Sequence, residues 1–413
     1  MAFNRRAQRD ARGAQGGVIP YGRQSIDSGD IGAVVDVLRS AALTQGKKVE
    51  EFEEAVAGYC GARFAIAVSN GTAALHVAAL ACGLKQGDEG MTSPNTFLAS
   101  ANSIAYCGAK PVFADIEPDT FCIDPAQIEK KMTRAAKAVI PVHFAGHPCD
   151  MEAIWKSARE RGLYVIEDAA HAIGSRWKDR DGAWRTVGSC THSHMTVLSF
   201  HPVKTVTSGE GGMILTNDEA LYKACRRLRS HGMTRDPEEF EGTAFSSQEL
   251  LMPWYYEMTS LGFNYRLTDI QSALGISQMK RIGAFISRRR EIWKRYNGEL
   301  SGLPGVTLPV EKEWADPAWH LYVLRVEQRD RLFRYLRDRG VGCHAMYMPV
   351  HLQPWYRRTY GHQRGDFPVA EEYFSKCLVL PLFPAMTDEM SGQVISAVKG
   401  FYEDGELRCG NLE

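Results

Sequence analysis

The segment Tyr164-Val165-Ile166-Glu167-Asp168 is an apolar run that ends on two carboxylates, and Ala169-Ala170-His171 follows it directly. A short apolar run of this kind is typical of a buried strand. In open α/β sheets, the carboxyl ends of the strands form the edge where ligands bind. We therefore expect Asp168 to lie at a ligand-binding edge of a sheet.

Apolar runs and helical patterns alternate on both sides of this segment. We expect strands at residues 64–68, 111–116, 138–144, 164–169, 195–200 and 211–216. Helical patterns occupy residues 96–107, 124–133 and 151–161. The alternation predicts an α/β fold in which a large domain holds a mainly parallel sheet between helices.

The chain is expected to form two domains joined by a long helix. The large domain covers residues 18–265, the linking helix 266–298, and a smaller C-terminal α+β domain 299–413. A strand at 319–326 and a helix at 329–339 are expected in the small domain. Residues 1–17 carry four arginines among small and polar residues and are expected to form a disordered tail.

The composition argues against several classes of function. Lysine plus arginine and aspartate plus glutamate number 49 each, so net charge favours neither nucleic acid nor an anionic membrane as a partner. No apolar run is long enough to span a bilayer. The ten cysteines form no CxxC pair and the N-terminus does not resemble a secretory signal, which favours the reducing cytoplasm. A small-molecule site is the expectation.

Lys204 ends the run Ser199-Phe200-His201-Pro202-Val203-Lys204, between two expected strands, and Gly209-Glu210-Gly211-Gly212 follows it. Loops held by rigid strands often carry chemistry. A lysine that forms a Schiff base must be partly deprotonated, and a carboxylate beside a pyridine nitrogen keeps the ring protonated. Lys204 and Asp168 could fill these roles in a pyridoxal phosphate (PLP) enzyme, although most lysines are solvated surface residues.

A phosphate site is expected where the strand at 64–68 turns into a helix through Ser69-Asn70-Gly71-Thr72. Glycine allows a tight turn, and Thr72 can cap the helix while offering its hydroxyl group. A helix N-terminus supplies backbone donors and a positive dipole to an anion. An ordinary capped helix would explain the same residues.

A metal site is the minor alternative. The acidic pair at 167 and 168 could bind a metal with His171, His143 and His147, and a second set would be Cys190, His192 and His194. These spacings match no usual zinc pattern, and the alternation in the second set is equally what one face of a strand produces.

Three further residues have two interpretations each. Phe97 begins a helical pattern and could stack on a planar ring or belong to the core. Asn264 and Arg266 precede the long helix and could cap it or reach an anion.

Together these motifs resemble the DegT/DnrJ/EryC1/StrS family of PLP-dependent sugar aminotransferases, over residues 18–400. The resemblance implies the aspartate aminotransferase-like fold. It implies that Lys204 forms a Schiff base with PLP and moves protons, and that Asp168 pairs with the pyridine nitrogen. Family members that act as dehydratases have histidine in place of this lysine, so Lys204 argues for amino transfer.

The same resemblance implies the remaining cofactor contacts. His171 would lie beside the ring hydroxyl, and Phe97 would stack on the ring. Gly71, Thr72 and Ser199 would hold the phosphate. Asn264 would reach the phosphate from the neighbouring subunit, which makes a homodimer obligatory.

Within the family, the chain is most similar to the transaminases of pseudaminic acid biosynthesis, which make UDP-4-amino-4,6-dideoxy-N-acetyl-β-L-altrosamine. Residues 19–26, 43–46 and 347–354 carry this similarity. The substrate contacts that we expect are Tyr21, Thr44, Gln45, Gly46, Arg266, Tyr347 and His351. Relatives usually have histidine just before the tyrosine, where this chain has Met346, which cannot hydrogen-bond a sugar or diphosphate as imidazole can.

The expected reaction moves an amino group from L-glutamate to C4 of a UDP-4-keto-6-deoxy-N-acetylhexosamine. Another nucleotide-linked keto sugar, such as UDP-4-keto-arabinose, is the alternative acceptor. A PLP-dependent lyase and a non-catalytic regulatory protein that kept the fold are further alternatives. Retention of both Lys204 and Asp168 disfavours the regulatory protein.

Overall fold

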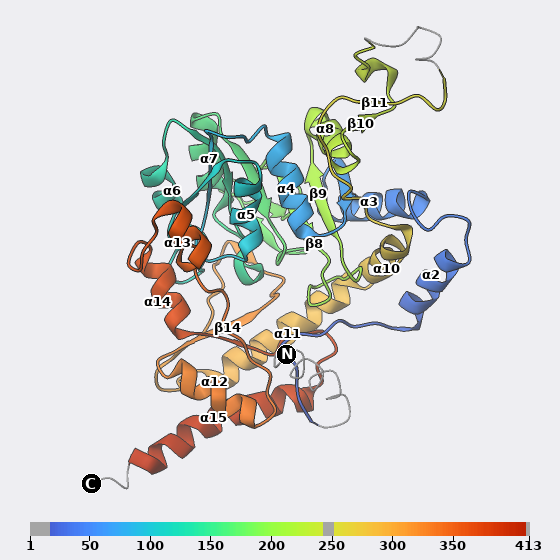
Figure 1. Cartoon of the computed structure of the whole chain (residues 1–413). Coiled ribbons are helices and arrows are strands. Elements are labelled where there is room, and N and C mark those ends of the chain that lie inside the picture. The colour runs from blue at the N-terminus through green and yellow to red at the C-terminus, as the bar shows by residue number, and fades with distance from the viewer. Residues whose placement is uncertain (1–16, 243–251, 410–413) are drawn as a thin grey trace.

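The computed structural model describes residues 17–242 and 252–409 (Figure 1). Its central sheet has seven strands in the order β1-β9-β8-β5-β4-β2-β3, and only the two pairs that involve β9 are antiparallel. The bounds are β1 Phe64–Val68, β2 Glu89–Thr92, β3 Lys110–Phe113, β4 Ala136–Ile140, β5 Tyr164–Asp168, β8 Met195–Ser199 and β9 Gly212–Thr216. The predicted α/β fold with a mainly parallel sheet is confirmed. The predicted tail at residues 1–17 lies, except for Gly17, outside the described residues.

Helices cover both faces of this sheet (Figure 1). One face packs against α4 Gly71–Ala81, α5 Leu98–Tyr106 and α8 Glu219–Arg229. The other face packs against α3 Lys47–Cys60, α6 Pro125–Lys131, α7 Met151–Glu160 and the start of α11 Ile282–Leu300. Side chains alternate between the two faces along each strand, so Ile166 packs toward α4 while Val165 joins the opposite core.

A strand that the sequence pattern missed, β2, lies inside the sheet between β4 and β3. Its residues Glu89–Thr92 include Gly90, and glycine is a residue type that usually indicates a turn. A Cβ atom at Gly90 would lie 2.7–2.9 Å from three side-chain carbons of Ile104 on α5. Glycine is needed there because the helix packs directly against the strand.

The linking helix predicted as one element over residues 266–298 is two helices, so that prediction is wrong in detail. The first helix, α10 Asp269–Met279, starts with a capping box at Thr268, and the second, α11, begins at Ile282. At the break, Arg281 forms ion pairs with Asp27 and Asp30, which flank the start of α2 Ser28–Leu38. The side chain at the junction therefore anchors the N-terminal helix.

The C-terminal region has its own antiparallel sheet and core. The sheet contains β12 Val306–Thr307, β14 Tyr322–Val326 and β15 Cys377–Leu380. Its helices are α12 Arg329–Asp338, α13 Pro354–Tyr360, α14 Pro368–Lys376 and α15 Asp388–Cys409. Helix α11 belongs to both cores, because Ile282 and Ile286 pack with the large sheet while Ile292 and Tyr296 pack with the small one. Figure 1 shows α11 between the central sheet and helices α12 and α15.

Short elements complete the fold. A three-stranded sheet joins β6 Arg176–Lys178 and β7 Trp184–Thr186 to β13 Ala315–Asp316, and β10 Met233–Thr234 pairs with β11 Glu257–Met258. Single turns of 3-10 helix are Phe144–Gly146, Pro237–Glu239 and Val350–Leu352. Among the described helices, none is long and apolar enough to cross a membrane.

The outer edge of β1 is covered by side chains and by one extended segment. Glu53 accepts a hydrogen bond from the Ala67 N–H at 2.8 Å, and Arg229 donates to the Ala67 carbonyl at 2.8 Å. Arg266 forms a bridge with Val68, and the Tyr265 carbonyl accepts from the Ser69 N–H at 2.7 Å. The segment before α10 is thereby held beside the first strand.

We expect Gly90→Ala to lower the free energy of unfolding by about 1–3 kcal/mol, because the added methyl group must displace the fully buried Ile104. Urea denaturation measures this change. Gly58→Ala on α3 is the matched control, since a Cβ atom there meets nothing within 4 Å and should stabilise the helix by about 0.5–1 kcal/mol. Equal effects of the two substitutions would contradict the packing argument.

Candidate active site

Asp168 lies at the carboxyl end of β5, on the face that α4 and α5 cover. Its side chain is 5% exposed. One carboxylate oxygen accepts from the Ser100 hydroxyl on α5 at 2.6 Å, and the other accepts from the Ala170 N–H at 3.1 Å. These bonds leave the carboxylate in one orientation, directed toward the strand ends.

Lys204 lies on the loop between β8 and β9, half-buried near Asp168. Its backbone N–H donates to the His201 carbonyl at 2.9 Å, which closes a turn. Burial lowers the pKa of Lys204 to about 8; the carboxylate of Asp168 acts in the opposite direction, and the charge of Arg289 lowers it further. At neutral pH, a substantial minority of such an amine is unprotonated and nucleophilic.

A histidine and a tyrosine lie beside these groups. His171 Nδ1 accepts from the Ala145 N–H at 3.3 Å, and its Nε2 is 3.2 Å from the Tyr347 hydroxyl. Burial, followed by the charge of Lys204, holds the pKa of His171 well below its usual value. The imidazole is therefore neutral. Its protonation state depends on its burial and on Lys204, which lies 33 residues further along the chain.

An anion cradle forms where α4 begins. A Cβ atom on Gly71 would lie 3.0 Å from the Ser199 Cβ, and one on Gly212 would lie 2.9 Å from the Gly71 nitrogen. The expectation that Thr72 caps this helix is wrong, because the Asn70 side chain accepts from the Ala73 N–H at 2.8 Å. The Thr72 hydroxyl is thus not required for capping, and a phosphate at this N-terminus fits the small residues around it.

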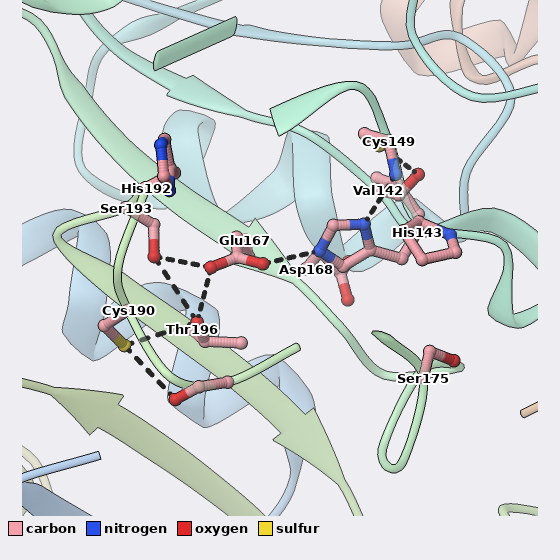
Figure 2. A network of polar contacts seen from close by, with 12 residues as sticks. Val142, His143, Cys149, Glu167, Asp168, Ser175, Cys190, His192, Ser193 and Thr196 are labelled. Carbon is pink, nitrogen blue, oxygen red and sulfur yellow. Dashed lines mark hydrogen bonds and ion pairs between the residues drawn. The ribbon is translucent and has the colours of Figure 1, made fainter. Parts of the chain in front are cut away.

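The neighbouring carboxylate, Glu167, points to the opposite face of the sheet and is buried in a polar network (Figure 2). It contacts His143 Nε2 at 2.7 Å and accepts from the hydroxyls of Ser193 at 2.5 Å and Thr196 at 2.8 Å. Burial alone would raise the pKa of Glu167, but the hydrogen bonds from these three side chains hold it below its usual value. The network fixes the end of β5 immediately before Asp168.

The predicted metal ligands already have hydrogen-bond partners. His143 Nδ1 accepts from the Cys149 N–H at 3.0 Å while its other nitrogen contacts Glu167 (Figure 2). His147 Nδ1 contacts the Pro148 carbonyl at 2.8 Å, and His194 Nδ1 accepts from the Val165 N–H at 3.0 Å. No group of three or more potential ligands comes together within the described ranges.

Phe97 and Tyr21 border the same region. Phe97 precedes α5 and is 56% exposed, so it is not a core residue, and its ring centroid lies 6.0 Å from that of Tyr347. The carbonyl of Tyr21 accepts from the Leu382 N–H at 3.2 Å, and the next residue, Gly22, lies against Val203 beside Lys204. The N-terminal segment therefore reaches the lysine loop.

His351 does not fit the predicted role of a substrate contact. Its side chain is fully buried, with Nε2 at 3.0 Å from the Glu371 carboxylate and its ring packed on Phe367. A substrate could touch it only if this packing opened.

The other predicted site residues form a second group at the edge beside β1. Asp269 accepts from the Gly46 N–H at 2.8 Å, which holds the turn at the start of α3 against α10. Within the described part of a single chain, no hydrogen bond, ion pair or ring contact joins this group to the residues around Lys204. The group consists of Thr44, Gln45, Gly46, Asn264 and Arg266.

Three groups in or beside the site were missed by sequence reasoning. Ser100 lies inside a helix, and its partner Asp168 is 68 residues away in the chain. Asn70 is the N-cap of α4 and bonds the nearby Ala73 N–H, although the sequence interpretation gave the cap to Thr72. His320 packs its ring 4.5 Å from that of His171, but it precedes a strand without any motif. Ser100 and His320 can be recognised only from tertiary contacts, whereas the preference of asparagine for N-cap positions could have identified Asn70.

Comparison with known proteins defines the class. The model of the DegT/DnrJ/EryC1/StrS aminotransferase family matches residues 24–399, so the chain belongs to this family. The family assignment together with the site shows a PLP-dependent sugar aminotransferase, and PLP is the cofactor.

Particular relatives agree over most of their length. The spore coat polysaccharide biosynthesis protein SpsC of Bacillus subtilis is 40% identical, over 92% of this chain and 96% of its own. Helicobacter pylori PseC, an aminotransferase of pseudaminic acid biosynthesis, superposes with a TM-score of 0.84 at 28% identity, over 94% of this chain and 100% of its own. DesV of S. venezuelae, solved with a ketimine intermediate, has a TM-score of 0.82 at 31% identity, over 94% of this chain and 99% of its own.

We expect Glu167→Gln to lower the free energy of unfolding at pH 7 by about 2–4 kcal/mol, because an amide nitrogen would replace a buried acceptor. A lowered carboxyl pKa contributes stability above the usual carboxyl pKa and loses it as pH falls. The difference from wild type should therefore shrink below about pH 4. Urea denaturation across pH measures it, with Ser193→Ala, expected to cost about 1 kcal/mol, as the comparison. A Gln variant as stable as wild type would show that the charge is not needed.

Proposed function

We propose that this protein transfers an amino group from L-glutamate to C4 of a UDP-4-keto-6-deoxy-N-acetylhexosamine, as in pseudaminic acid biosynthesis. The observation that carries the proposal is the convergence of Lys204, Asp168 and the cradle at Gly71 and Ser199 on one edge of the sheet. The structural likeness to PseC supports this choice of sugar.

Lys204 is proposed to hold the cofactor and to carry the proton. Its partly unprotonated amine can condense with an aldehyde, and once displaced by the amino donor it can remove the proton from the α-carbon of the donor. When bound, PLP supplies an electron-accepting ring that stores the electron pair released in that step.

Asp168 is proposed to keep the pyridine nitrogen of the cofactor protonated. Its orientation is fixed by Ser100 and Ala170, so the negative charge stays in place during the reaction. His171 would lie beside the ring hydroxyl, and Phe97 would cover one face of the ring. Thr72 and Ser199 would add hydroxyl donors to the phosphate at the start of α4.

The sugar is proposed to lie against Tyr21 and Tyr347. The Tyr347 side chain contacts His171 from the loop before α13, and the N-terminal segment that carries Tyr21 reaches the lysine loop through Gly22. Met346 does not add a polar contact, because its side chain is buried in the core. This departure from the usual histidine supports a second candidate acceptor, another nucleotide-linked keto sugar such as UDP-4-keto-arabinose.

A second subunit is proposed to complete each site with residues of the group at the β1 edge. Asn264 is exposed, and within the described residues no hydrogen bond or bridge joins it to the Lys204 region of its own chain, as a residue that acts on a partner's phosphate requires. Large apolar side chains are also exposed nearby: Trp254 is 62%, Met258 60% and Leu261 78% exposed. Such a surface is typical of an interface between subunits.

We expect Lys204→Ala to abolish turnover while the protein stays folded, and Asp168→Asn to reduce turnover by roughly 10²-fold or more. The measurement is the visible absorbance of the PLP-loaded protein and the release of 2-oxoglutarate after addition of L-glutamate, followed by a screen of UDP-4-keto sugars. Turnover in the alanine variant would overturn the assignment of Lys204. Product without 2-oxoglutarate would favour a different donor or lyase chemistry.

A mixing experiment tests the shared site. Lys204→Ala chains should be inactive alone and Asn264→Ala chains only weakly active, but after unfolding and refolding together about a quarter of wild-type activity should return. Half of the dimers would then be mixed, and each mixed dimer would have one intact site of two. Mixed samples no more active than the average of the two variants would place Asn264 outside the partner's site.

A further inference from the structure

Arg289 on α11 is a fully buried cation without a carboxylate partner. Its side chain is 1% exposed, and among the described residues no acidic group pairs with it. One guanidinium nitrogen donates to the carbonyls of Leu382 at 2.9 Å and His320 at 3.1 Å, and Nε has no acceptor. A buried charge that is held only by carbonyls is costly, and its retention requires an explanation.

The carbonyls that Arg289 contacts belong to segments that border the Lys204 site. His320 packs its ring on His171, and its N–H donates to the Ala145 carbonyl at 2.8 Å. The N–H of Leu382 donates to the Tyr21 carbonyl at 3.2 Å. The guanidinium thus joins the helix that links the two cores to both segments.

Charged and titratable groups face Lys204 from every element around it. They are Asp168 from β5, His171 from the loop after it, His201 from the lysine's own loop, His320 from the segment before β14, and Arg289 from α11. Burial, then the charges of Lys204, His171 and Arg289, hold the pKa of His320 well below its usual value. Both buried histidines are therefore neutral, and Arg289 is the permanent cation among these groups.

We propose that Arg289 is a positioning residue of the Lys204 site: its guanidinium holds His320 and the Tyr21 segment in place, and its uncompensated charge favours the neutral amine of Lys204. The inference rests on the proposed role of Lys204 and deepens it. Burial by itself acts on the amine in the same direction, whereas Asp168 opposes it. A second cation inside the site offsets the carboxylate that the cofactor ring requires.

The test is the pH dependence of covalent PLP attachment to the full-length protein from which PLP has been removed. Only a neutral amine adds to the aldehyde carbon; the carbonyl oxygen then leaves as water, carrying the two protons of the amine. The rate of attachment, followed by absorbance, therefore rises with pH to a plateau whose midpoint reports the pKa of Lys204. In wild type, we expect a midpoint near 8.

Arg289→Met removes the charge and should move this midpoint upward by about one pH unit, which makes attachment at pH 7 about tenfold slower. One pH unit corresponds to about 1.4 kcal/mol, which is the Coulomb energy of two unit charges about 12 Å apart at an effective dielectric constant near 20. Arg289→Lys keeps the charge and should keep the midpoint. Arg290→Met is the matched control, because Arg290 lies next on the helix but pairs with Asp316 at 2.5 Å.

A midpoint in Arg289→Met equal to that of wild type would overturn the inference and leave Arg289 with a packing role only. An equal shift in Arg290→Met would also overturn it, since the effect would not be specific. If the methionine variant does not fold, Arg289→Gln, which keeps donors for the carbonyls but not the charge, should give the same upward shift. Lys204→Ala must lose covalent attachment; if it does not, the proposed function itself is wrong, whatever Arg289 does.

Discussion

The hydrogen bonds around the buried carboxylate of Glu167 hold the end of β5, and the geometry of the site depends on that strand end. Adjacent residues of a strand point to opposite faces, so fixing Glu167 on one side directs Asp168 to the other. Thr196 on β8 and Ser193 just before it supply this restraint from one side of β5, and His143, which follows β4, supplies it from the other. The two carboxylates have different tasks because the pleat of the strand separates them.

The electrostatics of the site follow from groups that no single element carries. Asp168 is the negative charge, Lys204 is partly neutral, and the buried histidines at 171 and 320 are neutral. Arg289 lies in the helix that both cores share, so its position is fixed by packing on either side. The proposed effect of Arg289 on Lys204 therefore depends on the packing of both regions.

Much of the fold could be predicted because its strands are short apolar runs separated by helical patterns. The strand Glu89–Thr92 was not predicted because it contains Gly90, and glycine is typical of turns. Glycine is required at this position because Ile104 approaches the strand closely. The break between α10 and α11 was not predicted because Arg281, at the break, forms ion pairs with Asp27 and Asp30, about 250 residues away in the chain. A local sequence pattern cannot predict contacts between residues so far apart in the chain.

Site residues that belong to sequence motifs could be predicted. Residues whose role depends on how deeply their side chains are buried could not. Lys204, Asp168, Gly71 and Ser199 follow strand ends and are brought together. His351 was expected at the site because of the resemblance of residues 347–354, but its ring is packed on Phe367 and bonded to Glu371. Arg289 has no distinguishing neighbour in the sequence and becomes notable only through its missing carboxylate.

The covered edge of β1 limits how two copies of the chain can associate. Glu53 and Arg229 occupy the backbone groups of Ala67, and the segment at 265–266 occupies those of the next two residues. At the opposite edge, β3 presents an exposed lysine at 110 and a proline at 111, which has no N–H to donate. Both edges are therefore poorly suited to accept a further strand from another molecule. Association through side-chain surfaces is favoured over pairing of these strands, which helps to protect a protein rich in parallel strands from open-ended polymerisation.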